Sequence, residues 1–77
     1  MNRNEIRDKI LKIAEYTAGV DLSEDENLKK SGLDSLAIVA VIVTIEESFQ
    51  ISFNDEDLQP KNLNTLSDLI DLTEKYL

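Results

Sequence analysis

A serine hydroxyl at the start of an apolar run is the group in this sequence whose chemistry is most specific. It lies in Gly32-Leu33-Asp34-Ser35-Leu36, where Gly32 permits an irregular backbone and Asp34 is a strong helix-capping type. The chain holds 0 His and 0 Cys, so no imidazole base activates Ser35 and neither a Ser-His-Asp triad nor a cysteine nucleophile can form. The simplest interpretation is an ordinary helix start, where a cap of this kind stabilises the helix by about 1 kcal/mol.

Acidic side chains gather in two other places, and neither predicts a metal site. In Asp21-Leu22-Ser23-Glu24-Asp25-Glu26, an EF-hand loop counted from Asp21 would need Gly at its sixth position and Glu at its twelfth. Those positions hold Glu26 and Gly32, so we expect a solvated acidic loop with, at most, loose surface binding of cations. The run Asp55-Glu56-Asp57 fits the first turn of a short helix, where negative charge favours the helix dipole.

The overall charge narrows the function classes. The chain has 77 residues, 16 acidic and 8 basic, and a net charge of -8, which argues against nucleic-acid binding because phosphate backbones are bound by clustered Lys and Arg. The apolar run Leu36 to Ile45 is about half as long as a membrane-spanning helix, and residues 1–12 lack the apolar run of a secretory signal. We expect a cytoplasmic protein without membrane insertion.

A first amphipathic helix is predicted before the serine motif. Asn2 with Glu5 resembles a capping box, and Gly19 is a typical end signal, which gives a helix of about three turns. Its core stripe is Ile6, Ile10, Ile13, Ala14 and Thr17. The connection from Gly19 to Asp34 has no helical period, but it carries apolar anchors that predict packing against the core, namely Val20, Leu22, Leu28 and Leu33.

The segment from Ser35 to Gln50 is predicted to be the central helix. Its β-branched run is also compatible with a buried strand, and that alternative stays open. Asp34 as a cap and the length of the segment favour the helix. On a helix, one face carries the core stripe Ile38, Val41, Ile42, Ile45 and Phe49, and the opposite face carries Leu36, Ala40, Val43 and Glu47, flanked by Val39 and Glu46.

The remainder predicts one short helix and one final helix. Ile51 to Phe53 is a connector, Asn54 to Gln59 reads as a capped helical turn that stops before Pro60, and Thr65 with Asp68 begins the last helix. That helix has the stripe Leu66, Leu69, Ile70, Thr73 and Tyr76. Phe49 and Phe53 are expected in the core, and Tyr16 and Tyr76 in amphipathic packing. The fold class is an all-α bundle of three main helices and one short helix.

The motif and its context together resemble the acyl carrier protein family. The resemblance rests on Gly32-Leu33-Asp34-Ser35-Leu36, the apolar helix ending Glu46-Glu47-Ser48-Phe49, the long first loop and the short acidic helix before Pro60. It covers nearly the whole chain and implies one carrier domain, residues 1–77. It also implies a non-catalytic protein, expected to be a monomer, whose Ser35 carries a 4′-phosphopantetheine arm that a phosphopantetheinyl transferase attaches from coenzyme A. The arm's thiol would hold acyl groups as thioesters.

The resemblance also implies a docking surface for the transferase and for enzymes that load and process acyl groups. The residues expected there are Asp34, Leu36, Ala40, Val43, Glu46 and Glu47. Carrier proteins of fatty acid biosynthesis usually present acids along this helix, whereas here Ala37 and Ala40 stand at two positions that are often acidic. The neutral, apolar centre of this docking surface predicts a carrier for a specialised lipid or secondary-metabolite pathway rather than for the housekeeping enzymes of fatty acid biosynthesis.

Several alternatives remain open at this point. The cargo could be acyl, peptidyl or D-alanyl, and an acyl chain could be held between the helices by some of Ile38, Ile42, Ile45, Phe49 and Leu66, which an ordinary core would use equally. A different class is an unmodified acidic adaptor that binds a protein through Leu36, Ala40 and Val43. Covalent modification of Ser35 separates the two classes.

Overall fold

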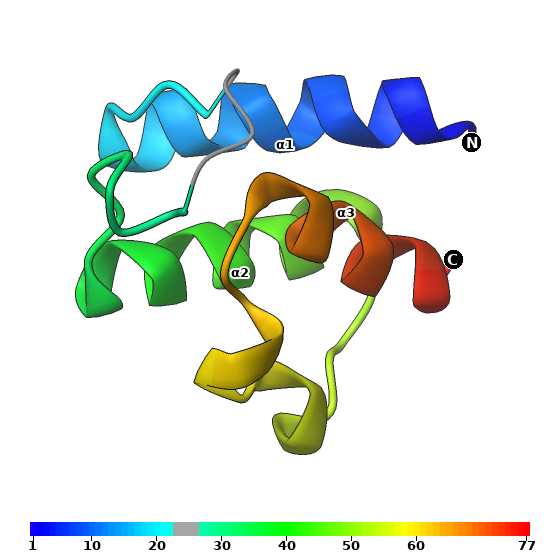
Figure 1. Ribbon diagram of the computed structural model, residues 1–77. Helices are drawn as coiled ribbons and strands as arrows, with labels where there is room; N and C mark the ends of the chain where they lie inside the picture. The colour runs from blue at the N-terminus through cyan, green and yellow to red at the C-terminus, as the bar shows by residue number, and fades with distance from the viewer. Residues whose placement is uncertain (23–26) are drawn as a thin grey trace.

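Three α-helices and two short 3-10 turns form the structure, a computed structural model that describes residues 1–22 and 27–77 (Figure 1). The elements are α1 Arg3–Ala18, α2 Ser35–Phe49, η1 Asp55–Leu58, η2 Pro60–Asn62 and α3 Leu66–Lys75. Within the described ranges the β-type pairing is one isolated bridge between Asn27 and Thr65. The predicted all-α class is confirmed.

The ends of α1 follow the sequence signals closely. The Asn2 side chain accepts a hydrogen bond from the Glu5 backbone N–H at 2.9 Å, and Gly19 ends the helix in the left-handed region at φ 66°. The helix has 16 residues, so it is longer than the three turns expected. Its inward face is Ile6, Ile10, Ile13 and Ala14, while Thr17 is only partly buried.

The central segment is a helix, which excludes the strand alternative. Its run of β-branched residues is accommodated because the side chains that gather on one face of a helix point into the core, namely Val41, Ile42, Ile45 and Phe49. Ile38, expected in the same stripe, is partly buried. In Figure 1, α1 and α2 run antiparallel one above the other, and α3 lies toward the end of α2 opposite Ser35.

The segment after α2 differs from the prediction in detail. Residues 55–58 form a 3-10 turn and not a turn of α-helix, and the Asn54 side chain makes no capping hydrogen bond. A second 3-10 turn, η2, follows at once and was not predicted. Asp57 lies in the first turn of η1 as expected, and its carboxylate also accepts hydrogen bonds from the Tyr76 hydroxyl and from Lys75 Nζ, the latter at 3.0 Å.

This contact ties η1 to the end of α3 and shifts three pKa values. The hydrogen bond from Tyr76, and then that from Lys75, lower the pKa of Asp57. The same bonds to the Asp57 carboxylate raise the pKa of Tyr76 and of Lys75. The Tyr76 ring also packs edge-on against Phe53, with centroids 5.1 Å apart. Tyr76 therefore packs as expected, whereas the expectation for Tyr16 was wrong, because its side chain is 92% exposed.

α3 begins with the predicted capping box. The Thr65 hydroxyl accepts from the Asp68 backbone N–H, and the Asp68 carboxylate accepts from the Thr65 backbone N–H at 3.1 Å. Arg3 of α1 forms ion pairs with Asp71 and Glu74, which join the two ends of the chain. The predicted inward residues of α3, Leu66, Leu69, Ile70 and Thr73, are all buried.

The long connection between α1 and α2 packs against the core as predicted. Leu22, Leu28 and Leu33 are each at most 1% exposed, and Val20 is partly buried. The Leu28 backbone N–H donates to the Asn64 carbonyl at 2.8 Å, which ties this connection to the entry of α3. The start of α2 is thereby fixed from two sides, by the core and by the segment before α3.

Candidate functional site

Ser35 is positioned by the three residues that precede it. Leu33 is fully buried, and its backbone N–H donates to the Leu28 carbonyl at 2.9 Å, so the chain enters α2 from a fixed point. Gly32 turns the backbone at φ 111°, a conformation that L residues rarely adopt. Asp34 then caps the helix, because its Oδ1 accepts from the Ala37 backbone N–H at 2.8 Å.

The Ser35 side chain itself is exposed on the first turn of α2. No side chain or backbone group in the described ranges forms a hydrogen bond with its hydroxyl, so the hydroxyl has no structural task there. The unpaired backbone N–H groups of a helix start favour a negatively charged group at this position. The arrangement suits covalent attachment of an anion by an external enzyme, since the chain has no His and no described side chain is hydrogen-bonded to the hydroxyl to take its proton.

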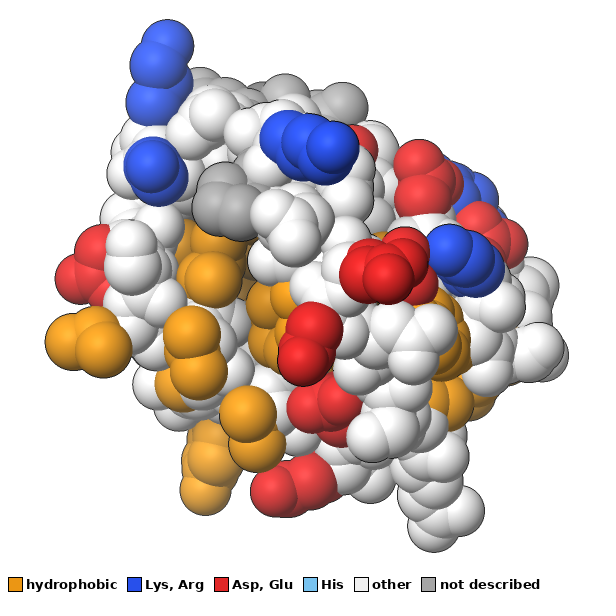
Figure 2. All heavy atoms as spheres, turned by 90° about the horizontal axis from the view of Figure 1, so that it is seen from below, with side chains coloured by type: hydrophobic (Ala, Val, Ile, Leu, Met, Phe, Trp, Pro, Cys, Tyr) orange, Lys and Arg blue, Asp and Glu red, His pale blue; other side chains and the backbone are white. Residues whose placement is uncertain are grey.

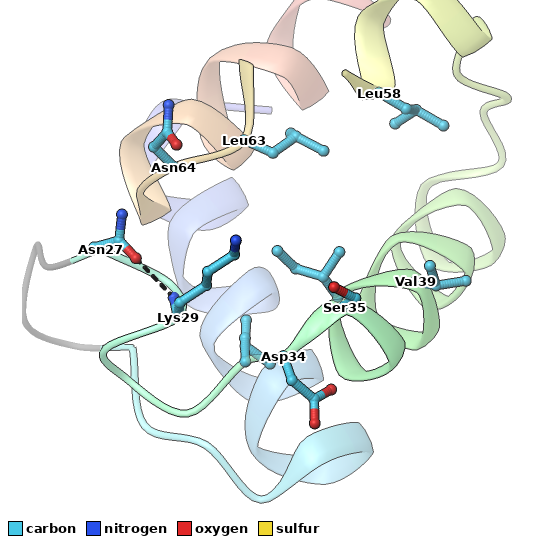
Figure 3. Close-up of a pocket in the computed structure, with 10 residues that line it drawn as sticks. Asn27, Lys29, Asp34, Ser35, Val39, Leu58, Leu63 and Asn64 are labelled. Carbon is cyan, nitrogen blue, oxygen red and sulfur yellow. Dashed lines mark hydrogen bonds between the residues drawn. The ribbon is translucent and has the colours of Figure 1, made fainter. Parts of the chain in front are cut away.

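A pocket of about 360 Å³ opens beside Ser35 (Figure 3). It lies between the start of α2, the end of the long connection and the segment that precedes α3. Its wall is apolar at Leu33, Ile38, Val39, Leu58 and Leu63, and polar at Asn27, Lys29, Asp34, Ser35 and Asn64. Reasoning from periodicity missed Asn27, Lys29 and Asn64, because they belong to irregular segments where no repeat indicates which way a side chain points.

The residues expected to line a cavity between the helices mostly form the core instead. Of those five, Ile38 lines the pocket beside Ser35. Ile42, Ile45, Phe49 and Leu66 are at most 9% exposed and pack with the other core residues. The sequence could not separate the two uses, because a cavity and a core draw on the same apolar types.

The outward face of α2 is apolar. Leu36 is 84% exposed, Val39 58% and Val43 46%, and Ala40 is exposed between them. Apolar side chains gather on one part of the surface in the view of Figure 2, with acidic side chains beside them. Large apolar side chains that lie together and exposed are typical of interaction surfaces, and the docking role of this face stays a prediction. Val39 was predicted only to flank this face, and its exposure places it within it.

The two glutamates at the end of α2 have different surroundings. Glu47 is exposed. Glu46 is partly buried, and its Oε2 accepts a hydrogen bond from the Phe53 backbone N–H at 2.8 Å, which holds the connector after α2. A structural role for Glu46 was not predicted, and its place in a docking surface stays a prediction.

Neither a metal-binding cluster nor a membrane-spanning helix is found among the described residues. Within residues 1–22 and 27–77 no group of three or more His, Cys, Asp or Glu could hold a metal ion. Most of the acidic stretch between Asp21 and Glu26 lies outside the described residues. None of the described helices is both long and apolar enough to span a membrane.

Comparison with known proteins identifies the family. The family described as "Phosphopantetheine attachment site" matches residues 4–73. An acyl carrier protein homolog of Mycoplasma genitalium is 37% identical over 91% of this chain and 86% of its own length. An acyl carrier protein of Thermotoga maritima is 31% identical over 99% of this chain and 96% of its own length.

Solved structures give the same result for the fold. A crystal structure of an acyl carrier protein from Thermotoga maritima superposes with a TM-score of 0.82 at 26% identity, covering 99% of this chain and 91% of that one. A holo acyl carrier protein from Nitrosomonas europaea, solved by NMR, gives 0.62 at 27% identity over 95% and 92%. The chain therefore belongs to the acyl carrier protein family, non-catalytic carriers with a phosphopantetheine prosthetic group that interact with enzymes of acyl pathways.

Proposed function

We propose that Ser35 is the residue that bears the 4′-phosphopantetheine arm. The observation that carries this proposal is the position of Ser35, which is exposed on the first turn of α2, free of structural hydrogen bonds within the described residues, and open to the pocket. Leu33 and Asp34 fix the backbone that leads into Ser35, by burial and by the cap, while leaving the hydroxyl accessible. Ser31 is partly buried and precedes the turn at Gly32, so it lacks this placement.

The residues present fit such a group. A phosphodiester on Ser35 would lie near the positive end of α2, and the pocket offers apolar and amide surface to the first part of the arm. In the loading step the Ser35 Oγ forms a bond to the pantetheine-side phosphorus of coenzyme A. The anhydride bond to the adenosine-side phosphate breaks, adenosine 3′,5′-bisphosphate leaves, and the Ser35 hydroxyl proton passes to a base of the transferase. The thiol of the bound arm supplies the thioester chemistry.

Intact-mass measurement tests the attachment. The protein is incubated with coenzyme A and a broad-specificity phosphopantetheinyl transferase, beside a Ser35→Ala variant. We expect the wild type to gain the mass of one arm and the variant to gain nothing. A wild type that stays unmodified with several transferases would instead favour an adaptor that binds partners through the same face of α2.

We further propose that the carrier serves a dedicated lipid or secondary-metabolite pathway. Support comes from the outward face of α2, where Leu36, Val39, Ala40 and Val43 are exposed and Glu47 supplies an acid only at the far end. Docking on such a face should depend mainly on the burial of apolar area, which contributes about 25 cal/mol per Å². Ion pairs, which dissolved salt weakens by screening, should contribute less. Enzymes with basic grooves for acidic carriers would bind this face poorly.

An added acid tests the idea of a dedicated pathway. Ala40→Glu is preferable to a change at Ala37, because Ala37 is partly buried against the core. We expect Ala40→Glu to strengthen binding to a housekeeping ketoacyl synthase, whereas Ser48→Glu, also exposed on α2, adds the same charge as a control. If the wild type already binds the synthase as tightly as Ala40→Glu does, the dedicated-pathway proposal is wrong.

Other features stay predictions. We propose acyl cargo, ahead of peptidyl or D-alanyl cargo, because the relatives that match this chain are acyl carrier proteins. A monomeric, cytoplasmic protein formed of a single carrier domain over residues 1–77 is expected, and sedimentation of the holo protein would check the oligomeric state.

A further inference from the structure

One cation stands in the wall of the pocket beside Ser35. Lys29 belongs to the end of the long connection, where its backbone N–H donates to the Asn27 Oδ1 at 2.9 Å. The neighbouring Leu28 backbone N–H binds the Asn64 carbonyl at 2.8 Å, so this part of the connection is held in place. Figure 3 shows the Lys29 side chain directed into the pocket that Ser35 also lines.

The Lys29 ammonium has no anionic partner in the described parts of the chain. The ion pairs found there involve Arg3, Arg7 and Lys75. Asp34 lines the same pocket, but its carboxylate caps α2 and no ion pair joins it to Lys29. The adjacent Lys30 is exposed and is absent from the pocket wall, which makes it a matched reference.

The arm would bring a negative charge to this place. A phosphodiester on Ser35 lies next to Asp34, so two like charges meet at the start of α2 and repel. The Lys29 ammonium, which has no ion-pair partner among residues 1–22 and 27–77, stands on the other wall of the same pocket, where it would offset that repulsion and attract the phosphate oxygens. We propose that Lys29 is a positioning residue that neutralises the phosphodiester in the holo protein and holds the first part of the arm against the pocket. This inference rests on the proposed attachment at Ser35.

Comparison of apo and holo forms tests this role without an activity assay. Wild type, Lys29→Gln and Lys30→Gln are each prepared in both forms, and loading is confirmed by intact mass. The quantity measured is the change in Tm from apo to holo. We expect the Tm of the holo form minus that of the apo form to be about 2 to 4 °C lower in Lys29→Gln than in the wild type, and the same in Lys30→Gln as in the wild type. The difference should vanish in 1 M NaCl, where the Debye length is about 3 Å.

NMR gives a second readout. On conversion from apo to holo, the side-chain signals of Lys29 should shift and those of Lys30 should not, and the ³¹P signal of the holo protein should move in Lys29→Gln and be restored in Lys29→Arg. Loading at Ser35 with an equal apo-to-holo Tm change in all three proteins, or with unmoved Lys29 signals, overturns this inference alone. Absence of any mass gain overturns the attachment, and the inference with it.

Discussion

Truncation of Leu36 should weaken recognition by the transferase with little effect on folding. Leu36→Ala removes three carbon atoms from a side chain that is 84% exposed in the free protein. If Leu36 is fully buried against the partner, its truncation should weaken binding by about 2 kcal/mol, taking about 0.8 kcal/mol per buried CH₂ scaled by that exposure. Such a loss corresponds to about a 30-fold fall in kcat/KM for arm transfer at low carrier concentration. The free energy of unfolding should change by less than about 0.5 kcal/mol, as is usual for exposed positions.

Tyr16→Ala is the matched control for this measurement. Tyr16 is a large exposed side chain, 92% accessible, and lies on α1 instead of α2. Its truncation should leave kcat/KM within about twofold of the wild type. A Leu36→Ala protein that is modified as fast as the wild type, or a Tyr16→Ala protein that is equally impaired, would refute the assignment of the docking surface to α2.

Three further predictions concern the structure that positions the site. Asp34→Ala should lower the free energy of unfolding by about 1 kcal/mol and the Tm by about 4 to 8 °C, because the hydrogen bond that caps the Ala37 N–H is lost. Asp34→Asn should keep most of the stability, because an amide oxygen can accept the same hydrogen bond. Equal losses of Tm in the two variants would contradict the cap. Ile45→Val should lower the free energy of unfolding by about 0.5 to 1.5 kcal/mol in urea titration, because Ile45 is fully buried, and an unchanged midpoint would contradict its place in the core. Tyr76→Phe should lower the urea midpoint of unfolding most at pH 7. The lowered pKa of Asp57 gives stability that is present above its ordinary value of 3.8 and is lost as the pH falls. The raised pKa of Tyr76 gives stability that is present below its ordinary value of 10.0 and is lost as the pH rises. The gap between wild type and Tyr76→Phe should therefore narrow toward both pH extremes, and a gap independent of pH would be the contrary result.

The ends of the helices were predictable because their signals are local. Asn2, Gly19 and the Thr65–Asp68 pair each act within four residues, so the sequence alone contains the whole interaction. The central helix was predictable for a different reason. Its β-branched residues favour a strand by propensity, but a helix places Val41, Ile42 and Ile45 together on one buried face, whereas a strand would point Val41 and Ile42 to opposite sides.

What was missed depends on contacts between distant segments. The bonds from Glu46 to the Phe53 backbone and from Tyr76 to Asp57 join residues that no periodic pattern connects. The pocket beside Ser35 is built largely by irregular segments, so Lys29 and Asn64 carried no signal in the sequence. Ser35 was predicted from the resemblance of its motif and context to the acyl carrier protein family, because a capped helix entry alone is an ordinary feature of helical proteins. The structure adds its exposure and the residues around it.

The most direct test of the account is the location of the arm in the loaded protein. After reaction with coenzyme A and a transferase, proteolysis and tandem mass spectrometry of the peptide that spans residues 31–36 would place the modification on a single residue. We expect the arm on Ser35, with none on Ser31. An arm on Ser31, on any other residue, or on a Ser35→Ala protein would contradict it.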